Sequence, residues 1–226
     1  MPFSDAFKDK YVAPEISRFT HADILDLSEV SREQKYWLLN FILNTAVRAD
    51  VDDVSKYVLV NFLRRTEAAF RDYAEARRRT LLYLNRSDPD LVAEYIRAID
   101  HWEQFLSHAE RAWTVLVRGR RILFADKRDG SVLQRLNYLY NQTKHLEGPF
   151  RTDPPDLSPG VIMPMWLRND GLHSSGGQLT FEEVAKILRS LAKWADAAQD
   201  PLTMAEAIRA SLTPDDELYD RIDLIV

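Results

Sequence analysis

The chain contains no cysteine among its 226 residues. Disulfide bonds, thiolate catalysis and cysteine-ligated zinc or iron–sulfur centres are therefore excluded. No run approaches the roughly 18 apolar residues that a membrane-spanning helix needs. Residues 1–19 lack the apolar core of a secretory signal. We therefore expect a cytoplasmic protein that does not enter the membrane.

The charge balance is also unremarkable in sign and size. A net charge of −5 and a pI near 5.6 give the chain no overall attraction to nucleic acid or acidic membranes. The sequence has no phosphate-binding loop, no dinucleotide fingerprint and no nucleophile elbow. It also has no Glu-x-x-His motif, which di-iron helical bundles need. We expect no metal and no cofactor.

Glycine and proline are scarce in the first two thirds of the chain. Between Ser31 and His145 the only examples are Gly119, Gly130 and Pro89, which favours long helices. Residues 1–19 look irregular, and Thr20 is a candidate cap for a short helix through Ser28. Apolar spacings of three and four residues then predict helices over about 32–49, 53–85, 89–117 and 131–146. Two helices of about 30 residues with a short connection predict an antiparallel hairpin.

The composition changes after the last of these helices. Residues 146–179 hold five of the ten prolines and five of the seven glycines. An Asn-Asp-Gly turn at 169–171 predicts a β-hairpin, and Pro164 restricts its first strand to a sheet edge. Thr180 and Glu183 form a capping box for a helix over 181–197, and a short helix over about 201–212 follows.

These elements predict an all-α fold: a four-helix up-and-down bundle with long antiparallel helices, a small C-terminal β-hairpin and two short helices. We expect a single domain over residues 1–226. Its parts are a helical bundle core (32–146), a loop with the hairpin (147–179) and C-terminal helices (180–226).

The stretch "YNQTKH", residues 140–145, is the most distinctive part of the helix over 131–146. At 100° per residue, one face carries Val132, Leu136, Leu139 and Thr143, extended by Leu133 and Tyr140. Asn137, Asn141, Lys144 and His145 lie on the opposite side. A solvated surface explains such a face, but asparagine is a poor helix former, and histidine is a usable base near neutral pH. A functional site is the alternative interpretation.

The stretch "RLNYLYNQTKH" resembles the last long helix of the HEPN superfamily, whose signature is often Arg-Asn-x-x-x-His. Asn141 and His145 match the asparagine and histidine, and Tyr140 stands at the arginine position. The resemblance covers about residues 32–146 and implies an all-α bundle that is commonly dimeric. Active members are metal-independent ribonucleases whose motifs meet across a dimer. In them the histidine and arginine act on the RNA 2′-hydroxyl and phosphate.

Three hypotheses follow for the function. The missing arginine favours a HEPN-like binding or regulatory module, a homodimer, in a defence or stress system. The second is an endoribonuclease with His145 as base, Asn141 orienting it, and Lys144 or an arginine as the cation. The third is an unrelated helical domain that binds a partner protein.

Charged and aromatic residues outside this stretch form further candidate clusters. Asn137 and a basic group are candidates for binding RNA; the group is Arg118, Arg120, Arg121, Lys127 and Arg128. Glu94, His101 and His108 share a stripe, but seven-residue spacing puts about 10 Å between them, too far for one ion. Arginines between 64 and 79 alternate with acids, which indicates a salt-bridged surface. Trp102, Trp113, Tyr138 and Tyr140 are core residues or stacking platforms for bases.

Overall fold

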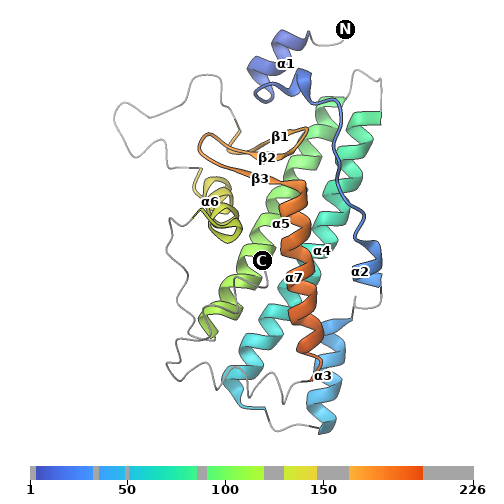
Figure 1. Ribbon diagram of the computed structural model, residues 1–226, viewed down its shortest axis with the longest axis vertical. Coiled ribbons are helices and arrows are strands. Elements are labelled where there is room, and N and C mark those ends of the chain that lie inside the picture. Colours follow the sequence, from blue (N-terminus) through green and yellow to red (C-terminus); the bar gives the residue numbers. More distant parts are fainter. Residues whose placement is uncertain are drawn as a thin grey trace, which may run out of the picture. The chain divides into compact units, whose positions relative to one another are not determined.

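The computed structural model describes residues 4–32, 36–48, 51–85, 91–119, 130–146 and 163–200 (Figure 1). Of these residues, 73% are helical, and a small three-stranded antiparallel sheet accompanies the helices, which confirms the predicted fold class. No helix among them has the length and apolar character needed to cross a membrane. The described helices are α1 (Asp5–Tyr11), α2 (Ser28–Arg32), α3 (Trp37–Arg48), α4 (Asp53–Asn85), α5 (Leu91–Gly119), α6 (Val132–Lys144) and α7 (Phe181–Ala197).

The chain divides into two compact units, each assembled from three separate segments. Unit 1 comprises Met1–Leu25, Asp72–Leu106 and Gly130–Val184, and unit 2 comprises Asp26–Arg71, Ser107–Asp129 and Ala185–Val226. The boundaries pass through α4, α5 and α7, so each of these helices contributes residues to both units. The single-domain organisation stays a prediction.

Helices α4 and α5 pack against each other as the predicted antiparallel pair. Within unit 1, Arg79 of α4 pairs with Glu94 near the start of α5, and Tyr73 contacts Phe105 further along it. Later residues of α5 therefore contact earlier residues of α4, as in an antiparallel pair. The observed bounds of α4 match the predicted range of 53–85. At its start, Asp52 caps the helix by accepting a hydrogen bond from the Ser55 N–H at 2.9 Å.

Trp102 is the centre of the unit 1 core and has no exposed surface. Its Nε1 donates to Thr80 Oγ1 at 3.1 Å, and that hydroxyl donates to the Ala76 carbonyl at 2.8 Å. The indole polar group is thus satisfied inside an apolar core, as burial requires. Three rings surround it with centroids 5.7 to 5.8 Å away: Tyr73, Phe105 and Phe181. Trp102 is a core residue and not a stacking platform.

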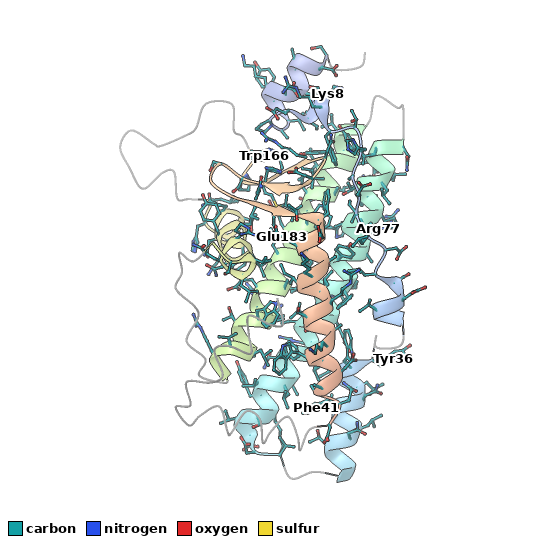
Figure 2. The ribbon with its side chains drawn as sticks, in the orientation of Figure 1. Lys8, Tyr36, Phe41, Arg77, Trp166 and Glu183 are labelled. Atoms are coloured by element: carbon teal, nitrogen blue, oxygen red, sulfur yellow. The ribbon has the colours of Figure 1, made fainter. Side chains whose placement is uncertain are left out.

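In unit 2, α3 is anchored through Trp37. Its Nε1 donates to Asp196 of α7 at 2.9 Å, and its ring lies 5.5 Å from that of Phe70. Glu67 of α4 accepts the Leu38 N–H at 2.9 Å and so caps the start of α3. Phe41 is buried on the same side as Trp37, whereas Tyr36 lies on the opposite side of α3 (Figure 2).

The sheet consists of β1 (Trp166–Arg168), β2 (Gly171–His173) and β3 (Gln178–Thr180), in the order β1-β2-β3. The predicted turn between β1 and β2 is present, and Pro164 precedes β1. The third strand was not predicted. A Cβ atom at Gly171 would lie 2.2 Å from the Leu179 carbonyl oxygen of β3, so only glycine fits at this pairing. Helix α6 lies beside β3 (Figure 1).

The N-terminal segment differs from the sequence-based expectation. Residues 5–11 form α1, capped by Ser4, and Ile16–Arg18 form a short 3-10 helix, where irregular structure was expected. The helix predicted from Thr20 to Ser28 is wrong, because residues 19–27 are not helical. Side chains of α4 occupy the carbonyls that such a helix would use. Tyr73 Oη donates to Leu25 O at 2.6 Å, and Arg77 Nε donates to Ile24 O at 3.0 Å.

The remaining boundaries follow the prediction unevenly. α7 matches its predicted range, and both halves of its capping box are formed: Thr180 N–H donates to Glu183, and Glu183 N–H donates to Thr180 Oγ1. The helix predicted over 32–49 is observed from Trp37, with residues 33–35 outside the described residues. The helix predicted over 201–212 also lies outside them.

We predict that Thr80→Val destabilises the protein by about 1–3 kcal/mol, because it removes the only described acceptor of the buried Trp102 N–H. Thr80→Ser keeps the hydroxyl and is the matched control. Urea unfolding followed by circular dichroism measures both variants. Equal midpoints for Thr80→Val and the wild type would show that this hydrogen bond contributes nothing.

Candidate functional site

Helix α6 is held at its start by its own sequence. Ser131 Oγ accepts the Gln134 N–H at 3.1 Å, which is the expected N-cap interaction. Leu136, Leu139 and Tyr140 are buried. Three residues of the predicted apolar face are thus buried, Tyr140 among them, and its other members, Val132, Leu133 and Thr143, are half-buried.

The opposite side carries the four predicted residues, called here the α6 polar face: Asn137, Asn141, Lys144 and His145. Asn141 Nδ2 donates to Asn137 Oδ1 at 2.9 Å, and both side chains are half-buried. His145 follows the last helical residue, and its N–H donates to the Asn141 carbonyl at 3.0 Å. The side chains of Lys144 and His145 are exposed. The α6 polar face thus consists of two half-buried amides, joined by a hydrogen bond, and two exposed side chains that carry nitrogen.

Lys144 has a second contact that bears on its role. Its Nζ lies 5.6 Å from the centroid of the Tyr140 ring, a cation–π distance. The ammonium group is therefore held close to the Tyr140 ring. It is a single, strongly hydrated cation and lacks the bidentate geometry of a guanidinium.

Arg135, the one arginine within α6, is engaged elsewhere. Its guanidinium donates to the Gly130 carbonyl and to Glu183 Oε1. The other oxygen of Glu183 accepts the Thr180 N–H at 2.9 Å, so one carboxylate joins α6 to the start of α7. Arg135 therefore positions the helix and is not a cation of the α6 polar face.

Tyr138 is also structural. A Cβ atom at Gly176 would lie 2.2 Å from Tyr138 Oη, and one at Gly177 would lie 2.8 Å from its ring. The ring therefore rests directly on the two glycines, where any side chain would collide with it. This contact accounts for the glycine pair before β3 and removes Tyr138 from the candidate base-stacking residues.

The predicted basic cluster is described only at its first member. Arg118 is exposed in the last turn of α5, where a cation favours the helix dipole. The other four members, Arg120, Arg121, Lys127 and Arg128, lie outside the described residues. Arg118 belongs to unit 2, whereas the α6 polar face belongs to unit 1.

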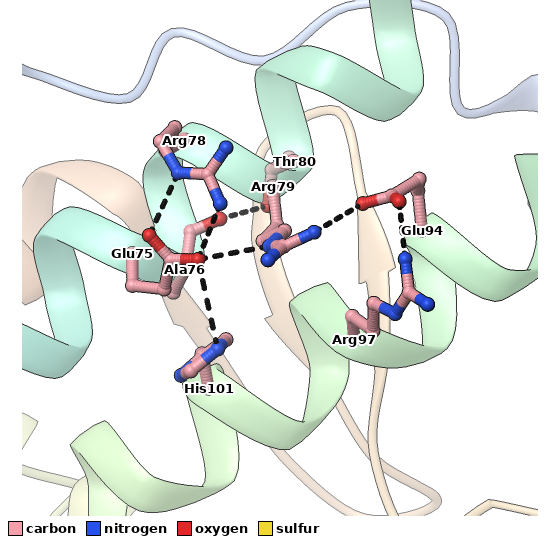
Figure 3. Close-up of polar contacts among 8 residues, drawn as sticks. All are labelled: Glu75, Ala76, Arg78, Arg79, Thr80, Glu94, Arg97 and His101. Atoms are coloured by element: carbon pink, nitrogen blue, oxygen red, sulfur yellow. Dashed lines mark hydrogen bonds and ion pairs between the residues drawn. The ribbon is translucent and has the colours of Figure 1, made fainter.

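The predicted salt-bridged surface between α4 and α5 is present in unit 1 (Figure 3). Glu75 accepts hydrogen bonds from Arg78 and Arg79, and Arg79 Nη1 also reaches Glu94 Oε2 at 2.9 Å. The hydrogen bond from Arg78 is the main reason that the pKa of Glu75 falls to about 2. His101 Nε2 lies 3.9 Å from the same carboxylate. Glu75 and Glu94 are therefore paired with arginines. No metal-ligand cluster is found among the described residues.

A shallow pocket of about 250 Å³ lies between the N-terminal segment and the β1–β2 turn, and no pattern in the sequence predicted it. Glu15, in a left-handed conformation with φ of 59°, pairs with Arg168 at 3.2 Å. Asn169 Oδ1 accepts the Thr20 N–H at 3.1 Å. These contacts join the N-terminal segment to the turn between β1 and β2. Its lining residues are Glu15, Arg18, Phe19, Arg168, Asn169 and Asp170.

Glu103 is a second feature that the sequence did not indicate. It lies half-buried on α5, and burial, followed by the nearby Asp100 charge, raises its pKa from 4.5 to about 7. The folded state therefore holds this proton more tightly than the unfolded state. Its contribution to stability is complete below pH 4.5 and is lost as the pH rises through 7.

We predict that Glu103→Gln raises the thermal midpoint at pH 8 by roughly 2–4 °C and changes it little at pH 4. Asp100→Asn removes the neighbouring charge and should give a smaller increase of the same sign. Calorimetry at the two pH values measures both. An equal effect of Glu103→Gln at pH 4 and pH 8 would contradict the raised pKa.

No protein-family model, curated protein or solved structure matches the chain. The geometry of the α6 polar face is therefore the basis on which its function is argued.

Proposed function

We propose that the chain is a HEPN-like binding module whose α6 polar face binds single-stranded RNA without cleaving it. The observation that carries this proposal is the burial of Tyr140, the residue that stands where the HEPN signature has its arginine. Arg135, the only arginine of α6, lies on another side of the helix and pairs with Glu183. The face keeps groups that bind a nucleic acid but lacks the guanidinium that phosphoryl transfer would use.

The chemistry of the face favours RNA over a protein partner. Helix α6 contains no aspartate or glutamate, so no carboxylate on it repels a phosphate. Asparagine amides pair with base edges and phosphate oxygens, and lysine neutralises phosphate. Lys144 in the last turn also offsets the negative end of the helix dipole. Single strands expose the base edges that the Asn137–Asn141 pair would contact.

Cleavage is the second candidate function, and Lys144 is the observation that favours it. Its position over Tyr140 puts one cation near the signature position, beside the exposed His145. In that mechanism His145 would take the proton of the 2′-hydroxyl, and Lys144 would meet the developing charge on the phosphate. The buried Tyr140 and the engaged Arg135 weigh against it.

A fluorescently labelled 20-nucleotide RNA of mixed sequence, titrated in EDTA, tests the proposal. We expect Lys144→Ala to weaken binding about tenfold and to reduce the salt slope by about 1. Asn141→Ala should weaken binding without changing the slope. Lys193→Ala, an exposed lysine of α7, is the control for loss of one charge.

The alternatives give different results in the same assay. Absence of RNA binding by the wild type, or equal effects of Lys144→Ala and Lys193→Ala, would contradict the proposal. Cleavage in EDTA that disappears in His145→Ala would establish the endoribonuclease instead. A protein that co-purifies with the wild type and not with Asn141→Ala would support the interaction domain.

We also propose that two copies pair with their α6 polar faces adjoining, which the HEPN resemblance implies. In that arrangement each face would gain the partner's Lys144 as a second cation. Asn137→Glu would bring two new carboxylates together and should shift the species in sedimentation velocity toward the monomer. Gln104→Glu, at an exposed position of α5, is the matched control. A monomeric wild type, or a dimer unaffected by Asn137→Glu, would reject this pairing.

A further inference from the structure

The outer side of α3 is an exposed apolar surface, called here the α3 outer face: Tyr36, Leu39, Ile42 and Leu43. Between 47% and 54% of each residue is exposed. The other side of the helix buries Trp37 and Phe41, and Figure 2 shows Tyr36 and Phe41 pointing away from each other. An exposed apolar patch of this kind marks an interaction surface.

The last described residues of the chain lie beside this helix. Asn44 Nδ2 of α3 donates to the Gln199 carbonyl at 3.0 Å, and Gln199 Nε2 donates to the Trp37 carbonyl at 3.4 Å. Asp200, the last described residue, is thus joined to a residue in contact with α3. Residues 201–226 continue from this point.

The sequence that follows has an apolar stripe of matching length. Residues 201–212 lie outside the described residues. In their sequence, apolar residues recur at helical spacing, with Thr203 and Glu206 on the other side and Arg209 at the edge of the stripe; the apolar residues are Pro201, Met204, Ala205, Ile208 and Leu212. Asp200 followed by Pro201 is a typical start of a helix. Twelve helical residues span about 18 Å, the length of the twelve-residue α3.

We infer that residues 201–212 form an amphipathic helix that covers the α3 outer face. Tethering at Gln199 places the stripe beside this face at an effective concentration of about millimolar, which a second copy does not reach in dilute solution. A phosphate-bearing lipid surface fits less well, because none of the four residues of the α3 outer face is a cation and the one cation of α3, Arg48, stands at its end. This inference does not depend on RNA binding.

The absence of native cysteine allows a direct crosslinking test in the full chain. Leu43→Cys is combined in turn with Met204→Cys, Ile208→Cys or Leu212→Cys on the stripe. The controls combine Leu43→Cys with Thr203→Cys or Glu206→Cys on the other side. At micromolar protein and mild oxidation, at least one stripe pair should form the intramolecular disulfide about tenfold faster than both controls, as measured by peptide mass spectrometry.

Two results of this experiment would overturn the inference. Equal rates for stripe and control pairs would show that the segment does not dock by its apolar side. Covalent dimers formed by Leu43→Cys alone, faster than any intramolecular disulfide, would show that a second copy covers the face.

Hydrogen exchange provides a second measurement without cysteine. Ile208→Asp should raise the exchange rate of the α3 amides several-fold, because it puts a charge in the apolar contact, whereas Thr203→Asp, on the other side of the segment, should leave the rate unchanged. If the two variants give the same α3 exchange, residues 201–212 do not cover this helix.

Discussion

The Glu183 carboxylate is the constraint on which the candidate site depends. One oxygen accepts the Thr180 N–H and so starts α7 at the end of β3, and the other pairs with Arg135 of α6. The same contact therefore fixes α6 beside the sheet and pairs the only arginine of that helix with an acid. The carboxylate that holds α6 in place is thus not itself a member of the α6 polar face.

The helices with local capping signals were predictable from the sequence, and the elements defined by distant contacts were not. Asp52, Ser131 and Thr180 each mark a helix start through a side chain within a few residues. The segment before α2 has an apparently adequate cap in Thr20, yet Arg77 and Tyr73, about 50 residues away, bind its carbonyls. Strand β3 depends similarly on pairing with β2, which three residues of sequence do not reveal.

For the site, helical periodicity predicted the two sides of α6 correctly, because burial of Leu136, Leu139 and Tyr140 follows from spacing alone. The engagement of Arg135 by a residue 48 positions later does not follow from spacing. The same holds for the contact of Tyr138 with Gly176 and Gly177, which looked like ordinary loop glycines. A single sequence shows which residues share a helix face but not which of them a distant element occupies.

The interleaved segments of the two units set an order for synthesis on the ribosome. Unit 1 takes its last described segment from residues 130–146 and 163–184, and unit 2 takes its own from residues 185–200. Helix α4 emerges early, but the strands and α7 residues that complete its surroundings emerge after more than half of the chain. Neither unit is complete while the nascent chain ends before α7. Contacts between α4 and α5 join residues close in the sequence and can form earlier, whereas the core around Trp102 is completed only when Phe181 of α7 has been made.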